Sequence, residues 1–131
     1  MSQENVEIIK AAIDAWSAGD MDRFGDFYDP TVVLHTVPDW PEPGPFVGRE
    51  AVMRLFRQVR ATWESDAVEP ISDFIDVGER VLVRHTWRVA GRDPEVSLAI
   101  TNVLTVRKGR IVHQEFFREH AEALKAVGLE E

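Results

Sequence analysis

The feature that most constrains the fold is a hydrophobic period of two in the C-terminal half of the chain. The period begins near Ala67 and is broken at three Gly-containing stretches, residues 77–79, 90–94 and 108–109. A period of two places successive side chains on opposite faces of a strand, and short breaks that contain Gly are typical of turns between antiparallel strands. The pattern therefore predicts four strands in an antiparallel meander.

The N-terminal half has helical spacing instead. Apolar residues recur three and four positions apart, and Gly19 and Asp20 are the residue types that end and begin helices. Residues 31–37 are rich in β-branched side chains and predict one strand before the third helix. The predicted helices cover residues 3–18, 20–29, 52–63 and 119–127.

The order of these elements indicates the fold class. Helices followed by a meander predict an α+β fold, with three N-terminal helices packed on one face of a strongly bent, mostly antiparallel sheet and a short C-terminal helix. The chain has 131 residues, about the length of one domain, so we expect a single domain over residues 1–131.

The charge balance narrows the range of partners. Acidic residues outnumber Lys and Arg by 23 to 15, which gives a formal net charge of −8. Phosphate backbones and anionic lipids repel such a chain, so neither nucleic acid nor a membrane is expected as a partner. The first residues lack a basic segment followed by an apolar run, and we therefore expect a cytoplasmic protein.

Two polar residues interrupt otherwise apolar strand faces. Alternation places His85 on the same side as Val83 and Trp87, and Asn102 is the one polar member of its face between Val96 and Val106. An unpaired buried polar group costs about 1–3 kcal/mol, so each side chain needs a hydrogen-bonding neighbour, water or ligand. Two interpretations stay open: the two residues satisfy each other in a closed core, or they form the polar floor of an apolar small-molecule cavity.

His35 is another candidate for chemistry. It shares a predicted strand face with Val33 and Val37, and an imidazole titrates near neutrality, so it is a candidate general base. A structural role for a lone strand histidine is the alternative. The chain has no cysteine, its histidines show no short metal-ligand spacing, and it has no P-loop or dinucleotide motif. No metal and no cofactor is therefore expected.

Several short segments carry a resemblance to a known family. They read AGDMD at 18–22, FYDP at 27–30, GREAV at 48–52 and VRKGRIV at 106–112, followed by the tail FFREHAEAL at 116–124. In this order they resemble the SnoaL-like branch of the nuclear transport factor 2-like superfamily over essentially the whole chain. The resemblance implies a conical roll in which a bent sheet wraps a long helix around a cavity for a small apolar molecule. Members include ketosteroid isomerases, polyketide cyclases and non-enzymes, so the fold does not select among functions.

The resemblance also implies site residues. Ketosteroid isomerases use an Asp base and an oxyanion hole of Tyr and a protonated Asp. The corresponding positions hold Leu34 or His35, Ala12 and Asn102, so that triad is not retained. From their own chemistry and positions we predict His35 or His85 as acid or base, and Asn102, which can still donate to a developing oxyanion, as the oxyanion donor. The predicted pocket residues are Tyr28, Trp40, Phe56, Trp63 and Trp87, with Arg118 as an anchor for an anionic substituent.

These features predict a protein that binds a small apolar molecule in an interior cavity. It would be a cofactor-independent isomerase, cyclase or lyase acting on a carbonyl compound, or a ligand-binding protein without chemistry. A protein-interaction module that uses the open sheet face is a third alternative, implied by the resemblance. We also predict a homodimer across the outer sheet face, because Leu82 and Val103 would otherwise expose apolar side chains to water.

Overall fold

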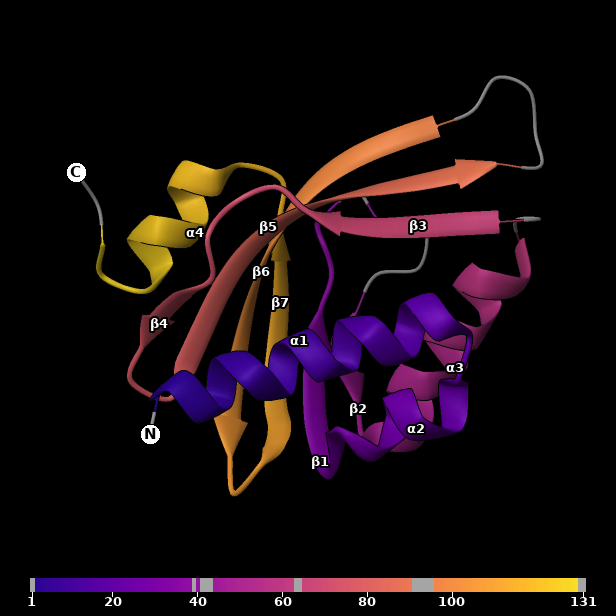
Figure 1. The fold of residues 1–131 in the computed structure, drawn as a ribbon, viewed down its shortest axis with the longest axis horizontal. Helices are drawn as coiled ribbons and strands as arrows, with labels where there is room; N and C mark the ends of the chain where they lie inside the picture. Colours follow the sequence, from indigo (N-terminus) through magenta and orange to yellow (C-terminus); the bar gives the residue numbers. More distant parts are fainter. Residues whose placement is uncertain (1, 39, 41–43, 63–64, 91–95, 130–131) are drawn as a thin grey trace.

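The structure, a computed structural model, describes residues 2–38, 40, 44–62, 65–90 and 96–129. These residues form helices and a sheet (Figure 1). The helices are α1 (Ser2–Ala18), α2 (Met21–Asp26), α3 (Arg49–Thr62) and α4 (His120–Ala126). The strands are β1 (Tyr28–His35), β2 (Phe46–Val47), β3 (Ser65–Pro70), β4 (Ile75–Val77), β5 (Arg80–Ala90), β6 (Val96–Arg107) and β7 (Arg110–Phe117).

The predicted α+β class is confirmed, and each predicted helix is present. The second helix ends earlier than predicted, at Asp26, and β1 already begins at Tyr28. The Asp29 carboxylate accepts hydrogen bonds from the backbone N–H and the hydroxyl of Thr31, at 2.9 and 2.5 Å. These bonds hold the chain around Pro30 in the strand, so the Asp-Pro pair lies inside β1 and does not end a helix.

The segment before Val77 contains two strands where one was predicted. β3 ends at Pro70, which has no N–H to continue a ladder. The Ile71 N–H donates to the Arg84 carbonyl and the Arg84 N–H donates to the Ser72 hydroxyl, both at 2.8 Å. These bonds turn the chain so that β4 pairs with a different part of β5. The meander therefore has one more strand than the sequence predicts.

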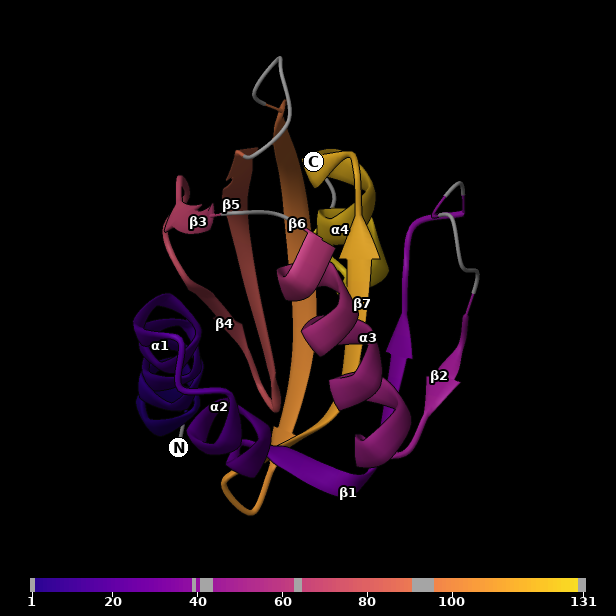
Figure 2. The same cartoon turned by 90° about the vertical axis from the view of Figure 1, so that its right-hand side faces the viewer.

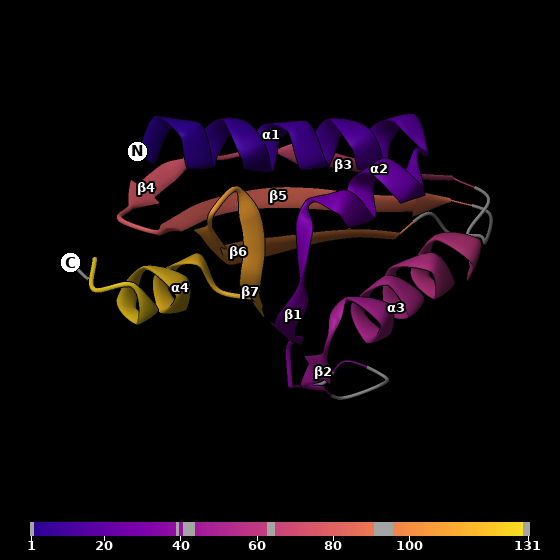
Figure 3. The ribbon, with the colours of Figure 1, turned by 90° about the horizontal axis from the view of Figure 1, so that it is seen from below.

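The sheet has the order β2-β1-β7-β6-β5-β3, with β4 also paired to β5. Neighbouring strands are antiparallel except β1 and β7, which are parallel. The sheet bends strongly, and α1 runs along the side formed by β3, β4 and β5 (Figures 2 and 3). Helices α3 and α4 lie on opposite sides of the sheet, so the main core forms between the concave face and α1, α2 and α3.

One extra residue in β7 decides which side chains of that strand face inward. Val106 of β6 pairs with Ile111, and the residue before Val106 pairs with His113, so Val112 is the extra residue. A bulge of this kind reverses the alternation of side chains beyond it. Ile111 and Gln114 therefore both point into the concave side, although strict alternation would separate them.

The outer sheet face is covered in part by α4. Leu82 and Val103 point outward, as alternation predicts, but they are 0% and 6% exposed because they pack against Ala123 and Val127. The apolar side chains that motivated the predicted homodimer are thus already buried within one chain. The dimer itself remains a prediction.

Candidate functional site

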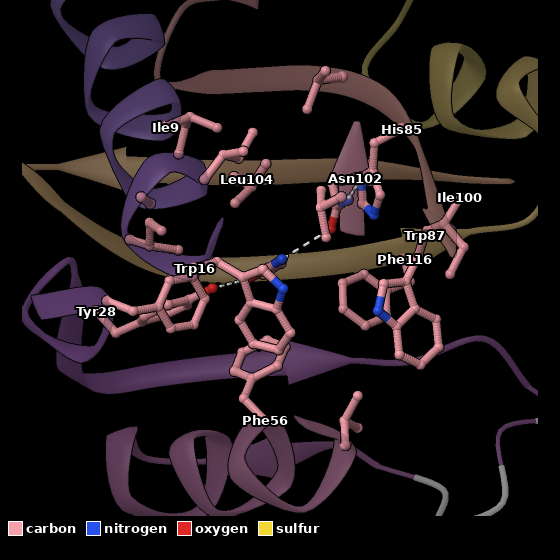
Figure 4. Close-up of a pocket in the computed structure, with 18 of the residues that line it drawn as sticks. Ile9, Trp16, Tyr28, Phe56, His85, Trp87, Ile100, Asn102, Leu104 and Phe116 are labelled. Atoms are coloured by element: carbon pink, nitrogen blue, oxygen red, sulfur yellow. Dashed lines mark hydrogen bonds between the residues drawn. The ribbon is translucent and has the colours of Figure 1, made fainter. Parts of the chain in front are cut away.

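A cavity of about 120 Å³ lies between the concave face of the sheet and helices α1 and α3 (Figure 4). Most of its lining is aliphatic or aromatic, including Ile9, Trp16, Phe56, Trp87, Ile100, Leu104 and Phe116. Apart from tryptophan indoles, the polar lining side chains are those of Tyr28, His85, Asn102 and Gln114. No Asp, Glu, Lys or Arg of the described residues lines this cavity.

The four polar side chains form one continuous chain of hydrogen bonds. The Tyr28 hydroxyl donates to Gln114 Oε1 at 2.6 Å, and Gln114 Nε2 donates to Asn102 Oδ1 at 2.8 Å. Asn102 Nδ2 lies 2.8 Å from His85 Nδ1. Three of these residues are buried, and His85 is half-buried at the end of the chain. We refer to these four side chains as the polar relay.

Burial sets the protonation of both ends of the relay. It raises the pKa of Tyr28 well above its ordinary range, so the phenol keeps its proton. Burial, together with the positive charge of Arg84, lowers the pKa of the His85 imidazole to about 4. His85 is therefore neutral at physiological pH, and it is poorly suited to hold a proton that it has removed from a substrate.

Aromatic side chains close the cavity on two sides. Trp16, Phe24 and Phe56 meet edge to face, with ring centroids 5.2 to 5.7 Å apart. On the other side Trp40 packs near Trp87 and Phe116, with centroids 6.5 and 6.3 Å apart. Edge-to-face and tilted arrangements at these separations are favourable aromatic contacts, so they give the apolar wall a defined shape.

Asp66 fixes two of the tryptophans in this wall. Its Oδ2 accepts hydrogen bonds from Trp16 Nε1 at 2.8 Å and from Trp87 Nε1 at 3.1 Å. The Arg60 guanidinium lies 3.6 Å from its Oδ1 and stacks over the Trp16 ring, 4.7 Å from the centroid. The carboxylate thereby ties α1, α3 and β5 together beside the cavity. Its side chain is 5% exposed, and it does not line the cavity.

The structure separates the predicted site residues into groups. Tyr28, Trp40, Phe56, His85, Trp87 and Asn102 all line the cavity. His35 does not line it, because Leu34 takes the inward position in β1 and His35 lies on the outer face beside His113, with ring centroids 5.0 Å apart. Arg118 also lies outside the lining; it is exposed, and its carbonyl accepts a hydrogen bond from Arg84. Trp63 lies outside the described residues.

Several residues of this region were not predicted from the sequence, among them apolar lining residues such as Trp16 and Phe116 and the polar residues Gln114 and Asp66. Gln114 was missed because strict alternation, which the bulge at Val112 breaks, would not place it with Ile111. Asp66 was missed because it lies at the start of β3, where no pattern marks one acidic residue as buried. The tryptophans themselves could have indicated an acceptor such as Asp66, because the N–H group of a buried tryptophan usually finds a hydrogen-bond acceptor.

Comparison with known proteins decides the family. The model of the SnoaL-like domain matches residues 9–114. The chain belongs to the SnoaL-like family. No curated protein sequence matches it. Among the described residues, no helix is both long and apolar enough to cross a membrane, and no three His, Asp or Glu side chains are placed to hold a metal ion.

Solved structures similar to this SnoaL-like chain have the same fold. A nuclear transport factor 2-like protein of unknown function from Burkholderia pseudomallei is 25% identical, with a TM-score of 0.77 over 98% of this chain and 99% of that one. A protein from Sinorhizobium meliloti, proposed to be a polyketide cyclase, is 27% identical, with a TM-score of 0.69 over 85% and 94%. TerC, co-crystallised with polyporic acid, is 19% identical, with a TM-score of 0.75 over 95% and 98%.

Proposed function

We propose that this SnoaL-like protein binds a small, uncharged, largely apolar molecule in the cavity described above. The observation that carries the proposal is a cavity of about 120 Å³ with an apolar wall and one short polar relay. Apolar cavities of roughly 150 Å³ are known to accept benzene, so the ligand is about one ring in size. An apolar lining with a few convergent polar groups is typical of small-molecule sites.

The geometry favours binding over the isomerase, cyclase or lyase chemistry expected as an alternative. Those reactions need a group that takes a proton from carbon, and no carboxylate of the described residues lines the cavity. His85 has Nδ1 engaged by Asn102 and a pKa lowered to about 4, so it is a weak base. The similarity to a protein proposed to be a polyketide cyclase keeps the enzymatic role as the second candidate.

A thermal-shift screen with one-ring ketones, alkenes, phenols and amines tests the proposal. A ligand present at 100 times its dissociation constant adds about 2.7 kcal/mol to stability, which is readily measured. Ala12 lines the cavity and is 4% exposed, so Ala12→Leu should fill the space and abolish the shift. Ala18→Leu, at the exposed end of the same helix, is the matched control and should keep the shift. A screen without any shift, or shifts unchanged by Ala12→Leu, would contradict binding in this cavity.

A further inference from the structure

The donor-to-acceptor direction of the hydrogen bonds along the polar relay bears on which ligands the cavity recognises. This inference rests on the proposed function. Gln114 and Asn102 each offer both a donor and an acceptor, so each amide fits the relay in either orientation. Tyr28 has no such freedom, because a phenol that keeps its proton must donate. The orientation of both amides therefore depends on where the Tyr28 proton goes.

The reversed relay leaves the Tyr28 proton without an acceptor. In that arrangement Gln114 Nε2 would donate to the Tyr28 oxygen, Asn102 Nδ2 to Gln114 Oε1, and His85 Nδ1–H to Asn102 Oδ1. Tyr28 is 2% exposed, and Gln114 is the one hydrogen-bond partner of its hydroxyl among the described residues. Folded proteins avoid an unpaired donor at such a buried position. The relay thus runs in one direction, from Tyr28 to His85.

This direction fixes the tautomer of His85. Because Asn102 Nδ2 donates to His85 Nδ1, the proton of the neutral ring is on Nε2. No hydrogen bond to Nε2 is found among the described residues, and none of their buried side-chain nitrogen or oxygen atoms lacks a partner. Nε2–H is therefore accessible, and Figure 4 shows this second ring nitrogen on the side of Trp87 and Phe116. The relay presents an unpaired donor in a largely apolar cavity.

We infer that the cavity selects ligands which present a hydrogen-bond acceptor, such as a ketone oxygen, to the Nε2–H of His85, and that Tyr28 and Gln114 are the positioning residues for this donor. A carbonyl oxygen accepts this hydrogen bond, whereas a hydrocarbon of the same shape leaves the donor unpaired. An ammonium ion has donors alone, and it meets no carboxylate among the described lining residues.

Two measurements on the unmodified protein test this inference. Nitrogen-15 NMR of the histidine side chains distinguishes the two neutral tautomers, and we expect His85 to carry its proton on Nε2 at pH 7. Calorimetric titration compares cyclohexanone with methylenecyclohexane, which has nearly the same shape without an acceptor. We expect the ketone to bind about tenfold more tightly, as one added hydrogen bond allows, and cyclohexylammonium not to bind.

The outcomes separate this inference from the proposed function. If none of the three compounds binds and the wider screen also finds no ligand, the proposed function fails. If ketone and alkene bind equally, or if the proton is on Nδ1, the cavity still binds ligands but the inferred selectivity is wrong.

Variants test the role of Tyr28 as a positioning residue. Tyr28→Phe removes the obligatory donor, so both orientations of the amides become possible. We expect both His85 tautomers in the NMR spectrum. Because the ketone binds the Nε2–H form alone, its preference should fall in proportion to the population of that form, about twofold when the two tautomers are equally populated. Val59→Ala, which alters the apolar wall at a side chain with no ring contact or hydrogen bond to the relay, is the control and should change the affinities for ketone and alkene by the same factor. A Tyr28→Phe variant that folds and keeps a pure Nε2–H tautomer would overturn the positioning role.

Discussion

At the scale of single residues, His85 links stability to pH. In the unfolded chain its pKa has the ordinary value of 6.5, whereas in the folded protein burial lowers it to about 4. Between these two values the unfolded state binds more protons, so the free energy of unfolding decreases as the pH falls. The contribution is fully present above pH 6.5 and lost below pH 4, and it amounts to about 3 kcal/mol.

The pH dependence of His85→Gln isolates this contribution from the other titrating groups. A Gln side chain offers an oxygen to Asn102 and does not titrate, so the variant should lack the part of the slope that His85 causes. Urea denaturation at pH 7 and at pH 5 should show the wild type losing about 2 kcal/mol more than the variant. Equal losses in the two proteins would show that His85 is not held neutral by burial.

Strand alternation predicts some of the cavity residues and fails for others. A period of two is sufficient to place His85 and Asn102 on the concave side, because both lie in regular stretches of paired strands. Alternation left two interpretations open, and each describes part of the site: the side chains bond each other, and they line a cavity. Gln114, the relay residue that bonds Asn102, lies beyond a bulge. The position of this bulge depends on strand pairing and not on local periodicity.

At the scale of elements, Asp66 joins two helices to the sheet. Asp66→Ala would leave the N–H groups of Trp16 and Trp87 unpaired and remove the carboxylate partner of Arg60, which would keep its hydrogen bond to the Trp16 carbonyl. Removing one member of a buried, hydrogen-bonded charge cluster typically costs about 3–5 kcal/mol, and we expect a loss of this size in chemical denaturation. Asp76→Ala, at an exposed position of β4, is the control and should change stability by less than about 0.5 kcal/mol. A small effect of Asp66→Ala would mean that water replaces the carboxylate.

Helix α4 contributes stability through its contact with the outer sheet face. Ala123 is 0% exposed and packs on Leu82 and Val103, so Ala123→Asp would bury a carboxylate without a partner. We expect a loss of about 2–4 kcal/mol in thermal or urea denaturation. Ala121→Asp is the matched control, because Ala121 is exposed in the first turn of the helix, where a negative charge is neutral or slightly favourable. Similar losses in both variants would contradict the packing of α4 seen here.

The elements themselves were largely predictable, and the differences have local causes. Helical periodicity and the capping residue Asp20 identify the helices, and Asp20 accepts the hydrogen bond from the Arg23 N–H as its position predicts. The start of β1 and the split between β3 and β4 were not predictable, because each depends on side-chain bonds to a turn. The bonds of Asp29 and Ser72 compete with the sequence signals for a helix end and a continuous strand.

At the scale of the whole molecule, the cavity follows from the bend of the sheet and not from any one segment. Periodicity predicts which side chains face inward, but it does not predict whether they meet. The resemblance to the SnoaL-like family supplied the conical shape, and the family is confirmed over residues 9–114. The anchoring role predicted for Arg118 from its charge requires a position in the cavity, and Arg118 is not among the residues that line it.

The predicted homodimer is the remaining expectation at this scale, and α4 restricts where it would form. With Leu82 and Val103 covered, Val47 of β2 is the one exposed large apolar side chain in the described strands, and it pairs with Val33 of β1. Val47 is 66% exposed, so burying its side chain in an interface would be favourable. A stable dimer buries about 800 Å² on each partner, so an interface here would extend from these residues over β7.

Sedimentation velocity at tens of micromolar protein tests this placement. We expect a dimer for the wild type and a monomer for Val47→Arg, because two arginines related by twofold symmetry would face each other in the interface. Ile71→Arg is the matched control: Ile71 is also apolar and 51% exposed, but it lies in the turn between β3 and β4. The control variant should therefore remain dimeric. A wild-type monomer would contradict the dimer, and a dimer that persists in Val47→Arg would place the interface elsewhere.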